Sequence, residues 1–293
     1  MLLAVWIKQD CFTTLLFVCY LLNMSSTQIH FSHANGFPAP SYRQLFKHLG
    51  DHGYNIGYLD QHGHNPRFPV NDNWEHLVAE LIHTVRQRYQ QPVIAVGHSL
   101  GGFLSLSAAS QQPQLFRAVV MLDSPLLTRM DQTVVMLAKR LGFIDRITPA
   151  GRTQGRRSSW PDRDQAQAYF ASKSLFKYFE PACLHDYLTY GLQENKQGVS
   201  LRYDVATELK IYRTIPHLPL RTKLTVPTAL LFGQHSRVVA HRHRRMITGR
   251  YRALVREVSG GHMFPFEHPK ETAEQIHHVI SHLLMRGEYA VSA

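Results

Sequence analysis

The stretch from Val93 to Gly102 reads VIAVGHSLGG. Its first four residues, Val93–Val96, predict a buried strand, and the Leu-, Ala- and Ser-rich segment that follows the stretch predicts a helix. Gly97 and Gly101 lie two residues on either side of Ser99, a spacing that lets strand and helix pass closely while the serine occupies a strained turn. A chance G-x-S-x-G often marks only a turn. Here the strand and helix around it make Ser99 the candidate nucleophile.

Composition indicates one globular core. The chain has 293 residues, of which 44% are hydrophobic, enough for a single core with room for an insertion. The formal net charge is +11, with cations concentrated in 152–163 and 241–252. A nucleic-acid interface would need aromatic residues interleaved with those cations or a known module signature, and neither is present. We therefore interpret the charge as a basic solvated surface and expect no nucleic-acid partner.

The spacing of the cysteines and histidines indicates neither a disulfide framework nor a metal site. Three cysteines, Cys11, Cys19 and Cys183, form no disulfide framework, which favours a reducing compartment and a cytoplasmic location. The 19 histidines include no H-E-x-x-H pattern and no Cys/His cluster at ligand spacing. We expect no bound metal, and we interpret His241 and His243 as surface residues.

The N-terminal residues 1–27 are treated as an extension. Cys11–Leu22 is an uncharged apolar run with the length of a signal-peptide core, too short to span a bilayer comfortably. Asp10 precedes the run directly and no small-x-small cleavage site follows it, so it is also a poor signal peptide. We favour Met24 as the natural start, which leaves 1–23 without a fold of its own, and we expect no membrane partner.

Past the extension, apolar runs alternate with amphipathic segments. The predicted strands are Ile29–Ser32, Tyr54–Leu59, Val93–Val96, Ala118–Leu122, Val226–Phe232 and Ala253–Val258. The predicted helices include Tyr42–Leu49, Asn73–Tyr89, Val239–Thr248 and Glu271–Leu284. This alternation predicts the α/β class, a mostly parallel sheet with helices on both faces.

Residues 126–216 break the alternation. They hold no clear buried strand and are rich in aromatic residues in helical segments. We interpret them as a helical cap inserted into a core of residues 28–125 and 217–293. Most of the aromatic residues must pack the cap against the core, and a few are expected to line a pocket.

Four motifs then carry a family resemblance. FSHANGFP (31–38) resembles the oxyanion loop of the α/β-hydrolase fold, DQHGHN (60–65) the D-x-x-G-H-x turn, GHSLGG (97–102) the nucleophile elbow, and GGHMFP (260–265) the catalytic-histidine loop. The motifs occur in the family's order, and the resemblance extends from His30 to Leu284. It implies the α/β-hydrolase fold, with the cap where this family commonly inserts one.

The resemblance implies a Ser-His-acid triad with Ser99 as nucleophile and His262 as base. Many relatives carry the acid in a G-x-x-D turn, but the corresponding turn, 233–236, reads GQHS and has no acid. The alternative family position is Asp123 in L-D-S-P, similar to a branch of bacterial esterases, although an Asp-x-Pro turn also explains it. We favour Asp123, with Asp60 as runner-up, and expect Ser236→Ala to change activity little.

The oxyanion that forms on attack needs two N–H donors. The resemblance implies the backbone N–H of Leu100, at the start of the helix, and that of Phe37 in the oxyanion loop. Asn35 stands where many relatives have histidine, and with His98 and Met263 it is a candidate for the substrate pocket. No metal or organic cofactor is expected, and water is the second substrate.

Haloalkane dehalogenases and epoxide hydrolases of this fold carry an aspartate at the elbow. The serine at this position in the chain therefore disfavours both reactions. Hydrolysis of a carboxylic ester is the first choice for this chain, with a thioester, a lactone or a carbon–carbon bond as alternatives. Two other classes stay open: a non-catalytic binder of the hydrolase fold, motivated by the acid-free turn 233–236, and a membrane-associated protein, motivated by Cys11–Leu22 and the basic surface.

Overall fold

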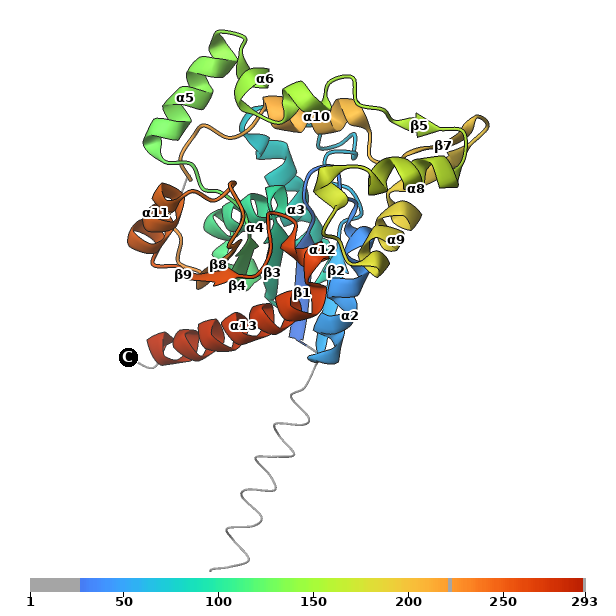
Figure 1. Ribbon diagram of the computed structural model, residues 1–293. Helices are drawn as coiled ribbons and strands as arrows, with labels where there is room; N and C mark the ends of the chain where they lie inside the picture. Colours follow the sequence, from blue (N-terminus) through green and yellow to red (C-terminus); the bar gives the residue numbers. More distant parts are fainter. Residues whose placement is uncertain (1–26, 221–222, 292–293) are drawn as a thin grey trace, which may run out of the picture.

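The computed structural model describes residues 27–220 and 223–291 (Figure 1). The apolar run Cys11–Leu22 and the proposed start at Met24 lie outside these residues. Within the described residues, no helix is long and apolar enough to cross a membrane. No group of three or more His, Cys, Asp or Glu in the same residues could hold a metal ion.

Six strands form the central sheet, and their positions confirm the predicted α/β class. Their bounds are β1 Thr27–Ser32, β2 Tyr54–Tyr58, β3 Val93–His98, β4 Phe116–Leu122, β8 Thr228–Gly233 and β9 Leu254–Val258. They pair in the order β2-β1-β3-β4-β8-β9, and every pair is parallel. Hydrophobic side chains point from both faces of such a sheet, so both faces need cover.

Helices supply that cover (Figure 1). Ile94 and Val96 of β3 belong to a core cluster that also includes residues of α2 and α13, whereas Val93 and Ala95 belong to a second cluster with α3, α4 and α11. The alternation follows from the two-residue period of a strand. These helices are α2 Arg43–Asp51, α3 Glu75–Arg88, α4 Leu100–Gln111, α11 His241–Tyr251 and α13 Pro269–Val291.

The sheet register brings the carboxyl ends of the central strands together. His98, the last residue of β3, pairs with Leu122, the last residue of β4. Gly233, the last residue of β8, pairs with Val258 of β9. The segments that follow these strands therefore emerge at one edge of the sheet, where ligands bind in open parallel sheets.

The segment between β4 and β8, called the cap segment below, carries α5 to α10 and also a small sheet that was not expected. The three strands β5 Ser159–Trp160, β7 Gly198–Leu201 and β6 Leu192–Asn195 are antiparallel. Strands this short give too little period-2 pattern to be recognised from sequence. The helices are α5 Arg129–Arg140, α6 Ile144–Ile147, α7 Ala150–Thr153, α8 Arg163–Ala171, α9 Pro181–Tyr190 and α10 Val205–Arg213.

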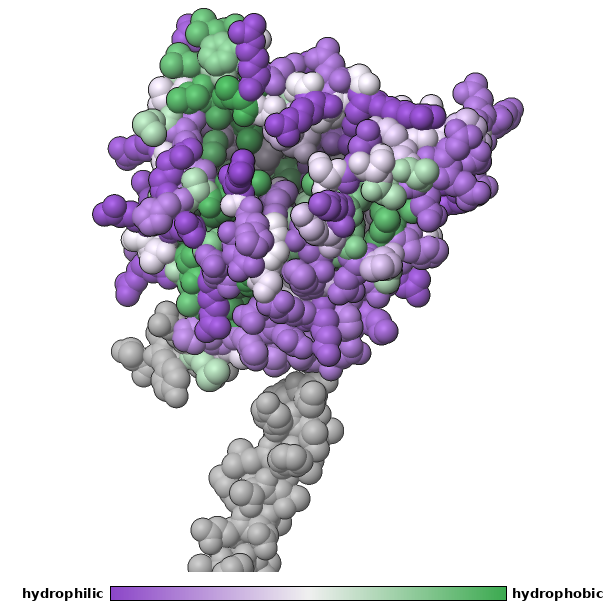
Figure 2. All heavy atoms as spheres, in the orientation of Figure 1, coloured by the Kyte–Doolittle hydropathy of each residue, from purple (hydrophilic) through white to green (hydrophobic). Residues whose placement is uncertain are grey.

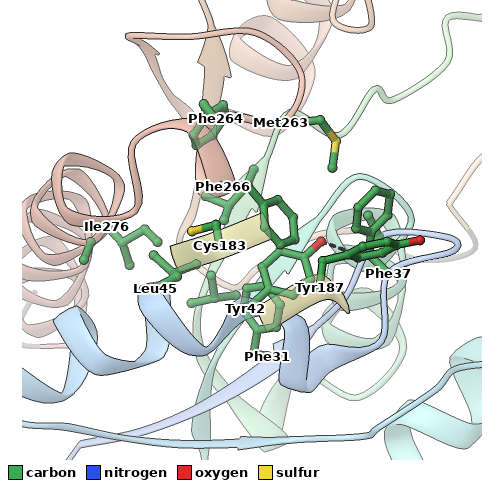
Figure 3. Packing of buried hydrophobic residues seen from close by; sticks show 14 of the residues in the cluster. Phe31, Phe37, Tyr42, Leu45, Cys183, Tyr187, Met263, Phe264, Phe266 and Ile276 are labelled. Atoms are coloured by element: carbon green, nitrogen blue, oxygen red, sulfur yellow. Dashed lines mark hydrogen bonds between the residues drawn. The ribbon is translucent and has the colours of Figure 1, made fainter. Parts of the chain in front are cut away.

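Short helical turns complete the chain. These are η1 Ala39–Tyr42, η2 Asp72–Trp74, η3 Pro113–Leu115, η4 Ser174–Phe176 and α12 Phe264–Glu267. Aromatic rings of the cap segment pack on the core. The distance between ring centroids is 5.0 Å for Tyr187 and Phe37 and 4.7 Å for Phe179 and Phe266. Figure 3 shows Phe37, Tyr187 and Phe266 in this shared cluster.

One surface expectation is wrong. His243 is only 6% exposed, and its Nε2 lies 3.2 Å from Asp131 Oδ2 of α5. The charged run around it hid this burial, because only one face of α11 meets the core. His241 is exposed, as expected.

Candidate active site

Ser99 occupies the tight turn between β3 and α4. Its backbone angles are φ 53° and ψ −114°, a strained conformation for a residue with a side chain, and its N–H donates to Leu122 O at 2.8 Å. A Cβ on Gly97 would lie 2.2 Å from Gly101 O, and one on Gly101 would lie 2.0 Å from Ser32 O. The glycines are therefore required by close packing, and the predicted strand, turn and helix are confirmed.

Asp123 directly follows β4 and is fully buried. Its Oδ1 accepts the Gly233 N–H at 3.1 Å, and its Oδ2 accepts the Ser236 hydroxyl proton. The same Oδ2 lies 2.6 Å from His262 Nδ1. Because a buried carboxylate must be hydrogen-bonded, these three donors fix its orientation. The turn 233–236, which lacks an acid, thus contacts the acid that β4 supplies.

His262 lies in the loop after β9, with its side chain 28% exposed. The loop is fixed on both sides of it. His98 Nε2 lies 2.9 Å from the His262 carbonyl oxygen, and Gly261 N–H donates to Glu267 Oε2 at 2.7 Å. The imidazole is therefore held by its own Asp123 contact and by a constrained backbone.

The Ser99 hydroxyl forms no hydrogen bond with the described residues. Catalytic hydrogen bonds are often formed only when a substrate is bound. The side chain is partly exposed at the turn, between the buried His98 and Leu100.

A buried hydrogen-bond chain joins the oxyanion loop to the histidine loop. Ala34 N–H donates to Tyr42 OH at 3.1 Å, and Tyr42 OH lies 2.8 Å from His98 Nδ1. Since His98 Nε2 faces a carbonyl, it must donate there, which leaves Nδ1 to accept the Tyr42 proton. Burial, and then the nearby His262, hold the pKa of His98 well below its usual value, so the ring stays neutral. Tyr42 was missed from the sequence because its partners are distant in the chain.

His98 therefore acts differently from the pocket residue expected. It is fully buried and both ring nitrogens have partners. Asn35 is also buried, and its Nδ2 donates to Glu208 O of α10 at 3.0 Å. Met263 is 3% exposed and belongs to the aromatic cluster of Figure 3. All three residues lie beside the site and support its loops.

The two expected oxyanion donors differ in availability. Leu100 is the first residue of α4, where the backbone N–H has no intrahelical acceptor. The Phe37 N–H donates to Ala34 O at 3.1 Å in a turn where Gly36 has φ +81°. An oxyanion could use the Phe37 N–H only by sharing it or by displacing that bond.

A charged pair from the cap lies against the oxyanion loop and was not found from the sequence. Arg156 NH1 donates to Glu208 Oε1 at 2.9 Å. That Oε1 lies 2.9 Å from the position a Cβ would take on Gly36. Burial raises the pKa of Glu208, and the charge of Arg156 opposes that rise. The cap is thus joined to the loop through a buried carboxylate.

The runner-up acid lies elsewhere. The Asp60 side chain is 55% exposed and pairs with Arg202 NH2 at 3.4 Å. Its turn is instead tied to the oxyanion loop, because the His62 N–H donates to the side-chain Nε2 of His33 at 2.8 Å. Its role in the structure is a surface ion pair and a loop contact.

The family follows from sequence comparison. The model described as the alpha/beta hydrolase family matches residues 31–275, and the chain belongs to this family. A type I acyl-CoA thioesterase, mpaH, of Penicillium roqueforti is 24% identical over 200 residues, covering 60% of this chain and 44% of that protein. A monoglyceride lipase homolog of monkeypox virus is 24% identical over 220 residues, covering 72% of this chain and 71% of that protein. This chain thus aligns with less than half the length of the fungal thioesterase.

Solved structures agree on the fold. E-2-(acetamidomethylene)succinate hydrolase is similar with a TM-score of 0.70 at 20% identity, covering 88% of this chain and 92% of that chain. The thioesterase domain from the curacin biosynthetic pathway has a TM-score of 0.64 at 18% identity, covering 87% and 92%. Identities this low show the fold alone.

Proposed function

We propose that this hydrolase-family chain cleaves carboxylic esters through Ser99, His262 and Asp123, with an acyl-enzyme intermediate. The observation that carries the proposal is the 2.6 Å distance between His262 Nδ1 and the buried Asp123 Oδ2. It is supported by the strained turn between β3 and α4 that holds Ser99. A carboxylate in this position fixes the imidazole tautomer and stabilises its protonated form.

The proposed reaction has two halves. Ser99 Oγ attacks the acyl carbon while His262 Nε2 takes the hydroxyl proton, and the same proton then goes to the departing alcohol oxygen. A water molecule next attacks the acyl carbon of the acyl-enzyme and gives a proton to His262. The bond between the acyl carbon and Ser99 Oγ then breaks, His262 returns the proton to Oγ, and the carboxylic acid leaves. In this proposal the Leu100 N–H, at the N-terminus of α4, donates to the oxyanion in both halves.

A thioester is the second candidate substrate. The names of two similar proteins favour it, since one is an acyl-CoA thioesterase and another a thioesterase domain. The triad chemistry is the same for both substrates, because only the leaving atom changes from oxygen to sulfur. The monoglyceride lipase homolog favours an oxygen ester.

The test is a substrate panel with purified full-length chain. The p-nitrophenyl esters with two to twelve carbons and the matching acyl thioesters are compared for kcat/KM, beside Ser99→Ala. We expect ester turnover that is lost in Ser99→Ala. A preference for thioesters over the matched esters would select the second candidate. A folded chain that cleaves neither series would contradict both and favour a non-catalytic binder.

A further inference from the structure

The cap helix α5 exposes an apolar stripe. Met130, Val134 and Leu137 of α5 and Leu141, the residue directly after it, are 67%, 47%, 43% and 69% exposed. Their spacing of four, three and four residues places them on one side of a helix. Ile147 of α6, 46% exposed, lies six residues further on. Figure 2 shows hydrophobic side chains gathered over the outer end of the cap, where α5 and α6 lie in Figure 1.

The opposite face of α5 anchors the helix. Val135 and Ala138 are buried with Ile144 in a small cluster of their own. Thr128 and Asp131 form a capping box at the start of the helix. A helix fixed in this way holds the stripe outward, and a contiguous apolar surface on a folded protein marks an interaction site.

The charges around the stripe are positive. Arg129, Arg140 and Arg146 are exposed. The two acids of this segment are already paired, because Asp131 accepts from Arg242 at 2.9 Å and Asp145 accepts from Arg213 at 2.9 Å. Long cationic side chains beside an apolar stripe can place their charges at a polar boundary while the stripe is buried.

A hollow of 440 Å³ continues this surface between α5 and α11. Its lining includes the apolar side chains of Met136 and Met246 and the cationic side chains of Arg129 and Arg250. The hollow therefore resembles the stripe, because apolar side chains again lie next to arginines.

We propose that the α5–α6 surface, defined as Met130, Val134, Leu137, Leu141 and Ile147, docks on an anionic phospholipid bilayer. An amphipathic helix with cations beside its apolar face binds such surfaces through buried apolar area and attraction to anionic headgroups. The chain's net charge of +11 acts in the same direction. This departs from the expectation of no membrane partner, because the exposure of α5 is a tertiary property. It does not depend on the proposed esterase activity.

The test is co-sedimentation of the full-length chain with vesicles of phosphatidylcholine, with and without phosphatidylglycerol. Wild type should bind the anionic vesicles. Val134→Ser/Leu137→Ser should lower the partition coefficient about tenfold or more, since burying each apolar side chain in the bilayer contributes favourable free energy of binding. The matched control is Leu175→Ser/Tyr178→Ser. It removes two apolar side chains elsewhere on the cap segment, which are 46% and 66% exposed.

Charge is tested in the same assay. Arg129→Gln/Arg140→Gln should lower partitioning about 25-fold, because each cation near an anionic surface contributes about 1 kcal/mol. Arg67→Gln/Arg117→Gln removes two exposed arginines outside α5 and α6, of which Arg117 lies at the start of β4, and should have a smaller effect. All variants contain residues 1–26, so the N-terminal segment is constant.

Three results would overturn the proposal. Wild type could fail to prefer anionic vesicles, or the control pairs could lose as much binding as the α5 pairs. Alternatively, gel filtration could reveal a dimer that the Val134→Ser/Leu137→Ser variant dissociates, in which case a second copy covers the surface. Circular dichroism and urea unfolding of the variants separate loss of docking from loss of fold.

Discussion

The Ser236 hydroxyl donates a hydrogen bond to Asp123 Oδ2, the same oxygen that lies 2.6 Å from His262 Nδ1. Ser236 stands in the turn where many relatives carry the catalytic acid. In this chain the turn contributes a hydroxyl that holds the acid supplied by β4. The contact is made possible by the pairing of β4 with β8, which brings the two turns side by side.

Ser236→Ala should lower kcat about fivefold, because one hydrogen bond of about 1 kcal/mol no longer orients the carboxylate. This revises the sequence-based expectation that the substitution changes little. Ester hydrolysis measures the effect. Ser259→Ala is the matched control, since its hydroxyl donates to Glu271 at 2.9 Å, away from Asp123. Equal activity of the two variants would refute a positioning role for Ser236.

Asp123→Asn should lower kcat about 10⁴-fold, the cost of losing the carboxylate that orients the base in serine-triad enzymes. The fold should survive, because asparagine can keep the Gly233 contact. Asp60→Asn, which alters a surface pair with Arg202, should retain activity. If Asp60→Asn were inactive and Asp123→Asn active, the proposal that Asp123 is the triad acid would be wrong.

Gly36→Ala should destabilise the fold and disturb the oxyanion loop. The residue has φ +81°, which costs an alanine about 1 kcal/mol, and its Cβ would lie 2.9 Å from Glu208 Oε1. Gly50→Ala, with nothing within 4 Å, is the control and should be neutral or slightly stabilising. Urea unfolding and kcat measure both effects. Equal stability of the two variants would show that the loop tolerates a side chain.

Acid should destabilise the fold through buried histidines. Burial is the largest cause that lowers the pKa of His30 to about 3 and the pKa values of His33 and His98 well below 6.5. The unfolded chain therefore binds these protons first as the pH falls. Stability present at pH 7 is lost below about pH 6.5, by about 2 kcal/mol per histidine at pH 5.

Urea unfolding at pH 7, 6 and 5 measures this loss. His30→Gln, which can keep a hydrogen bond to Tyr89, should remove one histidine from the pH dependence and flatten it. A wild type whose stability does not change between pH 7 and pH 5 would show that these rings are not held neutral.

Local pattern allowed much of the fold to be predicted. The strand, turn and helix around Ser99 follow from neighbouring residues, and the parallel sheet follows from alternating apolar runs. The same local reading placed Asp123 and His262 at the ends of strands, where the sheet brings them together.

Features built from distant residues could not be predicted. The Tyr42 to His98 bond joins residues 56 positions apart, and the Arg156 to Glu208 bond joins residues 52 apart. In neither pair does the sequence around one residue indicate which distant residue is its partner. The burial of His243 and the exposure of α5 likewise depend on which face of a helix meets the core.

The central claim is that Ser99 is an activated nucleophile, and reaction with a fluorophosphonate probe tests it most directly. Purified wild type, Ser99→Ala and Asp123→Asn are incubated with the probe, and the labelled peptide is identified by mass spectrometry. The account predicts a single label on Ser99, absent from Ser99→Ala and slowed in Asp123→Asn. A folded wild type that stays unlabelled, or a label on another serine, would contradict it.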